Sequence, residues 1–232
     1  MKNEQRRHAS LEFIGSSRDD LSGFPDDVKR SVGLALRTAQ KGGRHANAKP
    51  LSGFKGAGVL EIISDFDGNT FRAVYTVRFK GVIYVLHAFQ KKSRSGIKTP
   101  LNEINKIKSR LKDAEALYQN RHRGKMKKPV STKSSGNVFS DIGLPDADVH
   151  LLKADLIINI AELIKEKGLT QAQAAKLMGL AQPDVSKLMR GHFAGFSYER
   201  IFGFLTALGE NVTIRVREAK TKKQARVQLE LT

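Results

Sequence analysis

Residues 169–191 read LTQAQAAKLMGLAQPDVSKLMRG, a stretch that carries the start, turn and stop signals of two short helices. Thr170 and Gln173 are spaced as a capping box, in which each side chain accepts a hydrogen bond from the backbone N–H of the other residue. Gly179 supplies the positive φ that a tight turn needs. The stretch therefore predicts a helix-turn-helix motif.

The small and apolar residues of the motif predict which side of each helix faces the core. Ala174 allows the second helix to cross closely, and Leu177 is expected to face inward. Val185 and Leu188, three residues apart, anchor the second helix. Candidates for contacts with DNA are then the outward polar residues Gln182, Asp184, Ser186, Lys187 and Arg190, with Gln171 as a candidate phosphate contact. The alternative is a helical hairpin with a solvated polar face.

The chain is strongly basic, and most of the excess lies outside this motif. Its 232 residues include 41 Lys and Arg against 23 Asp and Glu, a net charge of +18. Such a charge attracts polyanions and makes nucleic acid the leading partner. Residues 1–125 carry 25 basic and 12 acidic side chains, a net charge of +13, and residues 126–232 carry +5. This indicates a second nucleic-acid site, with a basic face that serves solubility alone as the alternative.

Several classes of site are not expected. The absence of cysteine excludes disulfides, thiolate metal ligands and cysteine nucleophiles. The six histidines are scattered, so we expect no metal and no cofactor. Apolar runs are far shorter than a membrane span, and the N-terminus leads into no signal-peptide core, so we expect a cytoplasmic protein without a membrane partner.

The first part of the chain alternates between strand and helix signals. Residues 9–14 predict a strand and residues 26–40 a helix with one apolar face. Three strand-like runs follow at 59–66, 70–79 and 82–90, separated by the short turns DGN and KG. These runs predict an antiparallel meander.

A helix is expected to close this part of the chain. Thr99 is a good N-cap, and Pro100 suits the first helical position. An apolar stripe then runs to about Tyr118, formed by Leu101, Ile104, Ile107, Leu111 and Ala114. The order of elements is β-α-β-β-β-α.

Three regions follow from these patterns, and together they give an α+β fold class. Residues 1–122 form a β-α-β-β-β-α domain with an antiparallel sheet, and residues 123–137 form a linker with almost nothing to bury. Residues 138–232 form an all-α helix-turn-helix domain that ends in a β-strand at 212–217, which residues 226–231 or a partner's copy of that segment would pair.

Cations gather on the predicted meander. Alternation places Arg72 and Arg78 on one face of their strand, and His87 and Lys91 share a side of the next strand. The loop that follows adds Lys92, Arg94 and Lys98. Closely packed Lys, Arg and His can cleave RNA through its 2′-hydroxyl without metal, because crowding by like charges lowers a lysine pKa. The alternative is a structural histidine beside a solvated lysine turn.

The second half of the chain resembles a known family. Over about residues 137–218, including NVFSDIGLPDADVHLLKADLI, it is similar to the XRE/Cro-type helix-turn-helix family and to the HigA-like antitoxins within it. Ala181 stands where a Ser or Thr cap is usual, and Asp184 puts a negative charge where this kind of helix often carries a basic one. We expect these departures to alter affinity or base preference.

The first half resembles another family. Residues 9–118 look like the phage-derived HigB-like toxins of the RelE superfamily, on the stretches FRAVYTV, VIYVLHAFQKK and KTPLNEI. Members of this family are ribosome-dependent mRNA endonucleases with the β-α-β-β-β-α order. The resemblance implies that Arg72 stabilises phosphate and that Lys91 and Lys92 transfer protons and bind phosphate. It makes His87 and Lys98 second choices, and Arg78, Arg94 and Lys98 are the candidates for RNA binding.

Together these resemblances imply a toxin-antitoxin module on one chain. The N-terminal domain would be a metal-independent endoribonuclease acting on mRNA, with the ribosome as a partner. The C-terminal domain would restrain it, bind operator DNA as a homodimer and repress its own operon. The alternative is a transcriptional regulator whose RelE-like domain is inactive and serves binding or dimerisation. A third interpretation is a nucleic-acid-binding scaffold without regulation.

Overall fold

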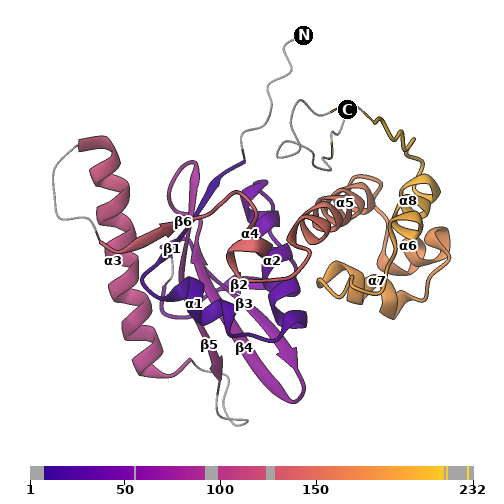
Figure 1. Cartoon of the computed structure of the whole chain (residues 1–232). Helices are drawn as coiled ribbons and strands as arrows, with labels where there is room; N and C mark the ends of the chain where they lie inside the picture. The colour runs from indigo at the N-terminus through magenta and orange to yellow at the C-terminus, as the bar shows by residue number, and fades with distance from the viewer. Residues whose placement is uncertain are drawn as a thin grey trace. The chain divides into compact units, whose positions relative to one another are not determined.

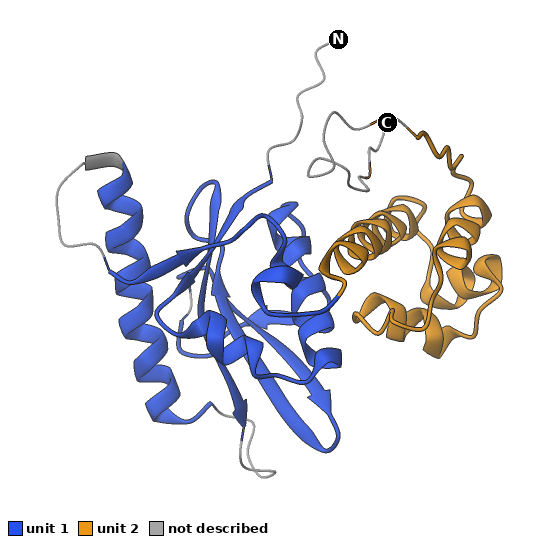
Figure 2. Cartoon of the chain, viewed as in Figure 1, with its two compact units in different colours: residues 1–145 blue, residues 146–232 orange. Residues whose placement is uncertain are grey.

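The computed structural model describes residues 8–54, 56–91, 99–123, 129–216, 218 and 229 (Figure 1). The chain divides into two compact units, residues 1–145 and residues 146–232 (Figure 2). Unit 1 contains a sheet with helices, and unit 2 is helical where it is described. Mixed α and β content is therefore confirmed.

Unit 1 is built on a six-stranded sheet with the order β2-β3-β4-β5-β1-β6. Its strands are β1 (Ser10–Ile14), β2 (Ala48–Pro50), β3 (Val59–Phe66), β4 (Asn69–Thr76), β5 (Val82–Lys91) and β6 (Ser131–Lys133). Its helices are α1 (Ser17–Ser22), α2 (Asp26–Gln40), α3 (Leu101–Arg123) and α4 (Val138–Asp141). The β-α-β-β-β-α order is present, with α1 and β2 added to it.

The meander is confirmed, but the sheet is mixed rather than antiparallel. Strands β3, β4 and β5 pair antiparallel in sequence, as the turns predict. Strand β1 pairs parallel to β5, with Phe13 opposite Val85. The antiparallel prediction was wrong for β1 because the chain passes from β1 to β5 by a long crossover through α1, α2 and the intervening strands, and not by a tight turn.

Helices cover both faces of the sheet, with α3 on one side and α2 on the other (Figure 1). On the α3 side, Ile107 and Ala114 are fully buried against Val74 and Tyr84 of the sheet. On the other side, the rings of Phe24 and Phe71 meet edge to face. The apolar stripe of α3 is confirmed at Ile107 and Ala114.

The stripe does not extend to Leu101, which is 73% exposed. This residue is the first of the helix, where the chain has only begun to approach the sheet. The strand predicted at 70–79 also ends earlier, at Thr76. Phe79 lies beyond this end, so the alternation of β4 no longer applies to it, and it packs on the α3 side rather than on the side of Phe71.

The predicted linker 123–137 is partly folded where the structure describes it, from residue 129 onward. Residues 131–133 form β6, which pairs antiparallel with β1, and α4 packs against α2. Compact unit 1 accordingly extends to residue 145. The pairing uses main-chain groups, which every residue carries, so the polar side chains of this stretch gave no signal of it.

Unit 2 contains α5 (Ala147–Glu166), α6 (Gln171–Met178), α7 (Gln182–Met189) and α8 (Tyr198–Ala207). Thr170 and Gln173 form the predicted capping box, and Gly179 has a φ of 64° at the end of α6. Val185 and Leu188 are buried. The helix-turn-helix geometry is therefore confirmed.

Two details of unit 2 differ from the predictions. Leu177 is half exposed, and Met178 is buried in its place beside Ala174. Residues 212–216 do not form the predicted strand, and Val216 is 90% exposed. Alternation alone does not make a strand, because its backbone also needs a partner. Among the described residues, no helix has the length and apolarity that a membrane span requires.

The two ends of the α3 stripe provide a test of this packing. Ile107→Ala is expected to lower the free energy of unfolding by about 2–5 kcal/mol, because it opens a cavity under α3. Leu101→Ala on the same helix is expected to change it by less than about 0.5 kcal/mol. Urea unfolding of both variants measures the difference, and equal losses would show that α3 is docked in another register.

Candidate functional site

The structure places Arg72 and Lys91 on the same face of neighbouring strands. Arg72 lies directly opposite Phe89, and Lys91 lies opposite Thr70, two positions along each strand. Side chains two apart share a face, so Arg72 and Lys91 are diagonal neighbours, with a separation of about 7–8 Å between backbones. Lys91 is partly exposed at the end of β5.

Arg72 is buried and held in an ion pair. Its Nη1 atom donates to Glu61 Oε2 across 2.5 Å and to Thr99 Oγ1 across 3.1 Å. Glu61 lies on β3 and is buried as well. A buried cation of this kind needs a partner, and removing either member of such a pair typically costs about 3–5 kcal/mol.

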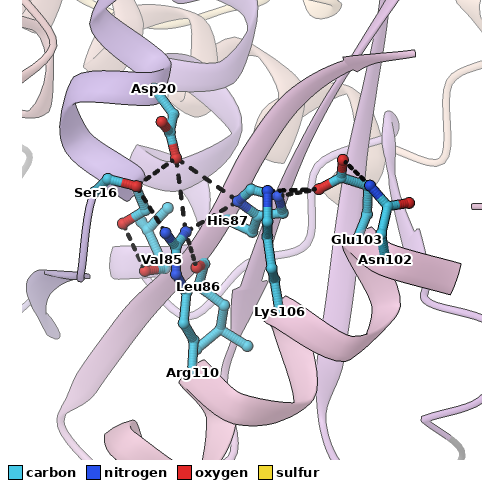
Figure 3. Close-up of polar contacts among 10 residues, drawn as sticks. Ser16, Asp20, Val85, Leu86, His87, Asn102, Glu103, Lys106 and Arg110 are labelled. Carbon is cyan, nitrogen blue, oxygen red and sulfur yellow. Dashed lines mark hydrogen bonds and ion pairs between the residues drawn. The ribbon is translucent and has the colours of Figure 1, made fainter. Parts of the chain in front are cut away.

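His87 occupies the centre of a polar network between α1, β5 and α3 (Figure 3). Its Nε2 atom lies 2.5 Å from Glu103 Oε2, and Arg110 Nη1 lies 2.9 Å from its Nδ1 atom. The side chain is only 4% exposed and stacks on Phe89. Both ring nitrogens are therefore engaged inside the protein.

These contacts define the protonation of His87. A guanidinium can only donate, so Nδ1 must accept the bond from Arg110, and the ring proton lies on Nε2 and is donated to Glu103. Burial lowers the pKa of His87 below its usual value of 6.5, which outweighs the opposite effect of Glu103. Burial alone would raise the pKa of Glu103, but the bond from His87 and the charge of Lys106 lower it overall. We therefore expect a neutral imidazole beside an ionised carboxylate at neutral pH.

Arg110 connects this network to the end of β1. Its Nη1 atom also donates to the carbonyl of Leu86 across 3.0 Å, and its Nη2 atom donates to Ser16 Oγ across 2.7 Å. Ser16 in turn donates to Asp20, whose carboxylate lies 3.6 Å from Arg110 (Figure 3). A Cβ at Gly15 would come within 3.2 Å of the Arg110 guanidinium, so glycine leaves the space that this side chain occupies.

The remaining predicted residues of this half are not part of the same cluster. Arg78 is exposed, lies beyond the end of β4 and pairs with Glu115, whereas Arg72 bonds Thr99 ahead of the start of α3. The structure thus does not bring Arg78 to Arg72 and Lys91. Lys92, Arg94 and Lys98 lie outside the described residues.

The acidic side chains that neutralise this face were not predicted from the sequence. Glu61 and Glu103 bind Arg72 and His87, and Arg110, which bonds His87, was likewise not predicted as a site residue. A weak signal was present at Glu61, which interrupts the apolar run of residues 59–63. Among the described residues, no cluster of three or more His, Cys, Asp or Glu could hold a metal ion.

In unit 2, side-chain contacts join the predicted DNA-contacting residues in pairs. Gln182 donates to the side chain of Gln171 across 2.8 Å, so the starts of α6 and α7 adjoin. Lys187 lies 3.8 Å from Asp184, and Arg190 donates to Ser186. Ala181 provides no side-chain cap for α7. A polar, partly charged surface is therefore presented by the second helix of the motif.

Comparisons with known proteins cover both units. Residues 19–112 match the family described as phage derived protein Gp49-like, and residues 138–217 match the family described as helix-turn-helix domain. The chain joins a Gp49-like domain to a helix-turn-helix domain. A solved structure titled "Putative XRE Family Transcriptional Regulator" is 34% identical over 38% of this chain and 100% of its own, with a TM-score of 0.36. No curated protein matches the chain.

These matches confirm the two resemblances at the level of the families. The Gp49-like match contains Arg72, His87 and Lys91, together with Glu61, Glu103 and Arg110. The helix-turn-helix match contains all six predicted DNA contacts. Placement in the HigB and HigA branches stays a prediction.

We expect the His87 network to make the Gp49-like domain less stable in mild acid. Below the usual histidine pKa of 6.5, the unfolded chain takes up a proton that folded His87 resists, so stability is full above this pH and falls as the pH drops below it. The lowered pKa of Glu103 acts in a separate window, below its usual 4.5. The melting temperature should therefore fall between about pH 7 and about pH 5.5.

Thermal melts of three chains measure this effect. His87→Gln should show a smaller loss of melting temperature over that range than the unchanged chain. His192→Gln, which alters an exposed histidine, should follow the unchanged chain. Parallel pH profiles for all three would show that His87 does not carry the effect.

Proposed function

We propose that this chain is a toxin-antitoxin module in which the Gp49-like domain cleaves mRNA on the ribosome and the helix-turn-helix domain binds operator DNA. The observation that carries this proposal is the succession of the two family matches, residues 19–112 and 138–217, on one chain. The net charge of +13 on residues 1–125 supports a polyanionic substrate for the first domain. Covalent linkage keeps the two domains at roughly millimolar effective concentration.

The RNA-cleaving site would centre on Lys91 and Arg72. Lys91 is the partly exposed cation of the pair, so it can reach a phosphodiester without rearrangement. Arg72 would stabilise the extra negative charge of the pentavalent phosphate once substrate competes with Glu61 for its guanidinium. Lys92 would bind phosphate, with Arg94 and Lys98 as further RNA contacts.

The bonds and protons of this cleavage reaction balance without a metal ion. The ribose 2′-hydroxyl loses its proton to a base and attacks the adjacent phosphorus, the bond from phosphorus to the 5′-oxygen breaks, and that oxygen gains a proton. Lys91 or Lys92 would carry these proton transfers. His87 would act as a positioning residue, because both of its nitrogens are held by Glu103 and Arg110.

The DNA-binding half would use the exposed side of α7. Gln182 can pair with adenine, and Lys187 and Arg190 can bind guanine or phosphate. Gln171, which bonds Gln182, would contact the phosphate backbone. We propose a homodimer on a palindromic operator, with Asp184 reducing the attraction for DNA, and repression of the chain's own operon.

A second function is favoured by the burial of Arg72 and His87. Both side chains are buried and bonded to carboxylates within the protein, as in a structural ion pair. In this alternative the Gp49-like domain does not cleave RNA and serves binding or dimerisation in a transcriptional regulator. The two functions differ in what the isolated first unit does.

Growth and mRNA cleavage separate these functions. Expression of residues 1–145, the whole of unit 1, should arrest bacterial growth and cut mRNA on translating ribosomes. Lys91→Ala should lower cleavage by about 100-fold, because it removes a proton-transfer group. Lys49→Ala, at an exposed lysine of β2, is the matched control and should leave it unchanged.

Arg72 requires a compensated variant. Glu61→Gln with Arg72→Gln removes both charges, so no uncompensated buried charge is left to unfold the domain. This double variant should fold and lose cleavage. Growth without arrest and intact mRNA in cells that accumulate folded residues 1–145 would instead support the regulator.

Operator binding tests the second half. Gln182→Ala should cost about 1–3 kcal/mol of discrimination between operator and other DNA. Lys187→Ala should weaken binding to all sequences. It should also reduce, by about 1, the slope of the logarithm of the binding constant against the logarithm of the salt concentration. Lys165→Ala, at an exposed lysine of α5, should change neither. The assigned surface would be contradicted if all of these variants still discriminated operator from other DNA as the unchanged chain does.

A further inference from the structure

The boundary between the two families does not coincide with the boundary between the two compact units. The helix-turn-helix match begins at residue 138, whereas unit 1 extends to residue 145. Residues 138–145 therefore belong to the helix-turn-helix family by sequence and to the Gp49-like unit by packing. Residues 129–145, which include β6 and α4, are here called the docking segment.

The first half of the docking segment extends the sheet of the Gp49-like domain. Thr132 lies opposite Phe13, at the edge of β1 away from β5. Gly15 N–H donates to the carbonyl of Val130 across 3.0 Å, and Ser134 N–H donates to the carbonyl of Leu11 across 2.9 Å. This is the addition of a strand to a sheet edge, a common mode of peptide recognition.

The second half of the docking segment inserts an aromatic ring beside α2. Phe139 is 0% exposed, and a Cβ built at Gly33 would lie only 2.4 Å from its Cε1 atom. Gly33 lies in the interior of α2, where glycine weakens a helix relative to alanine. The missing side chain at Gly33 thus makes the space that the Phe139 ring fills.

The docking segment also holds its own bend. Asn137 caps α4 by accepting from the N–H groups of Phe139 and Ser140. Asp141 accepts from the hydroxyl of Ser134 and from the N–H of Ser135. These bonds preset the turn from strand to helix, which lowers the entropy lost on docking.

We propose that the edge of β1 together with the Gly33 position of α2 is a binding site of the Gp49-like domain for residues 129–145 of this chain. The helix-turn-helix half is then attached to the Gp49-like half in two ways, by the covalent chain and by the non-covalent docking of this segment. The inference deepens the proposed pairing of toxin and antitoxin halves, but it concerns association and makes no use of RNA cleavage. The site fits a strand followed by a short helix that presents a buried aromatic ring.

Cleaving the chain between α3 and the docking segment tests the proposal on the full protein. A site-specific protease sequence replaces residues 124–128, and the purified chain is cut there. The two pieces should co-elute in size-exclusion chromatography, including after dilution to about 1 μM, and should be separated by urea and re-form on its removal.

The contact of Phe139 with α2 can be changed in the docking segment, at Phe139, or in the Gp49-like domain, at Gly33. Phe139→Ala and Gly33→Ala should each weaken association of the cut pieces by at least about tenfold. Gly33→Ala is informative because alanine otherwise favours helix, so a loss reflects the clash with Phe139. Val130→Ala, in the same segment but 77% exposed, should leave association unchanged. In the double variant Gly33→Ala with Phe139→Ala, the two losses should not add, because the clash is gone.

Two outcomes would overturn the proposal. One is separation of the cut pieces of the unchanged chain at about 1 μM while circular dichroism shows both pieces folded. The other is association that is equally tight in Phe139→Ala, Gly33→Ala and Val130→Ala. Association with no RNA cleavage by residues 1–145 would reject the nuclease and keep the docking site, so failures of the two proposals are distinguishable.

Discussion

The hydrogen bond from Arg110 to His87 is the contact on which the arrangement of unit 1 depends. Through Arg110, the end of β1, the start of α1, strand β5 and helix α3 meet at one point (Figure 3). Because a buried donor or acceptor without a partner costs about 1–3 kcal/mol, each member of this network restricts where its neighbours can lie. The network therefore orients α3, which the apolar contacts of Ile107 and Ala114 alone would hold less specifically.

Burial of charge explains how the basic face of the meander is organised. Arg72 and His87 point to the covered side of the sheet, so each is matched by a carboxylate, from Glu61 and Glu103. Lys91 lies further along the same face at the partly exposed end of β5. The chain thus separates a buried arginine and a buried neutral histidine, which support the fold, from a lysine that is available to a polyanion, and this is the basis for centring the proposed chemistry on Lys91.

Local patterns predicted the elements that local physics determines. The turns between the strands predicted the meander, and the caps at Thr170 and Gly179 predicted the ends of α6. Contacts that depend on register or on distant segments were not predictable in this way. Glu61 meets Arg72 only because β3 and β4 pair as they do, and β6 is too short and polar to show a strand pattern. The exposure of Leu101 likewise depends on where α3 first reaches the sheet.

The position of the proton on His87 tests the central network most directly. A long-range proton–nitrogen correlation spectrum of the isotope-labelled chain at about pH 7.5, assigned with His87→Gln, distinguishes the two neutral forms and the charged form of the ring. A neutral ring with its proton on Nε2 is predicted, because Arg110 can only donate to Nδ1. A proton on Nδ1, or on both nitrogens, would contradict the account.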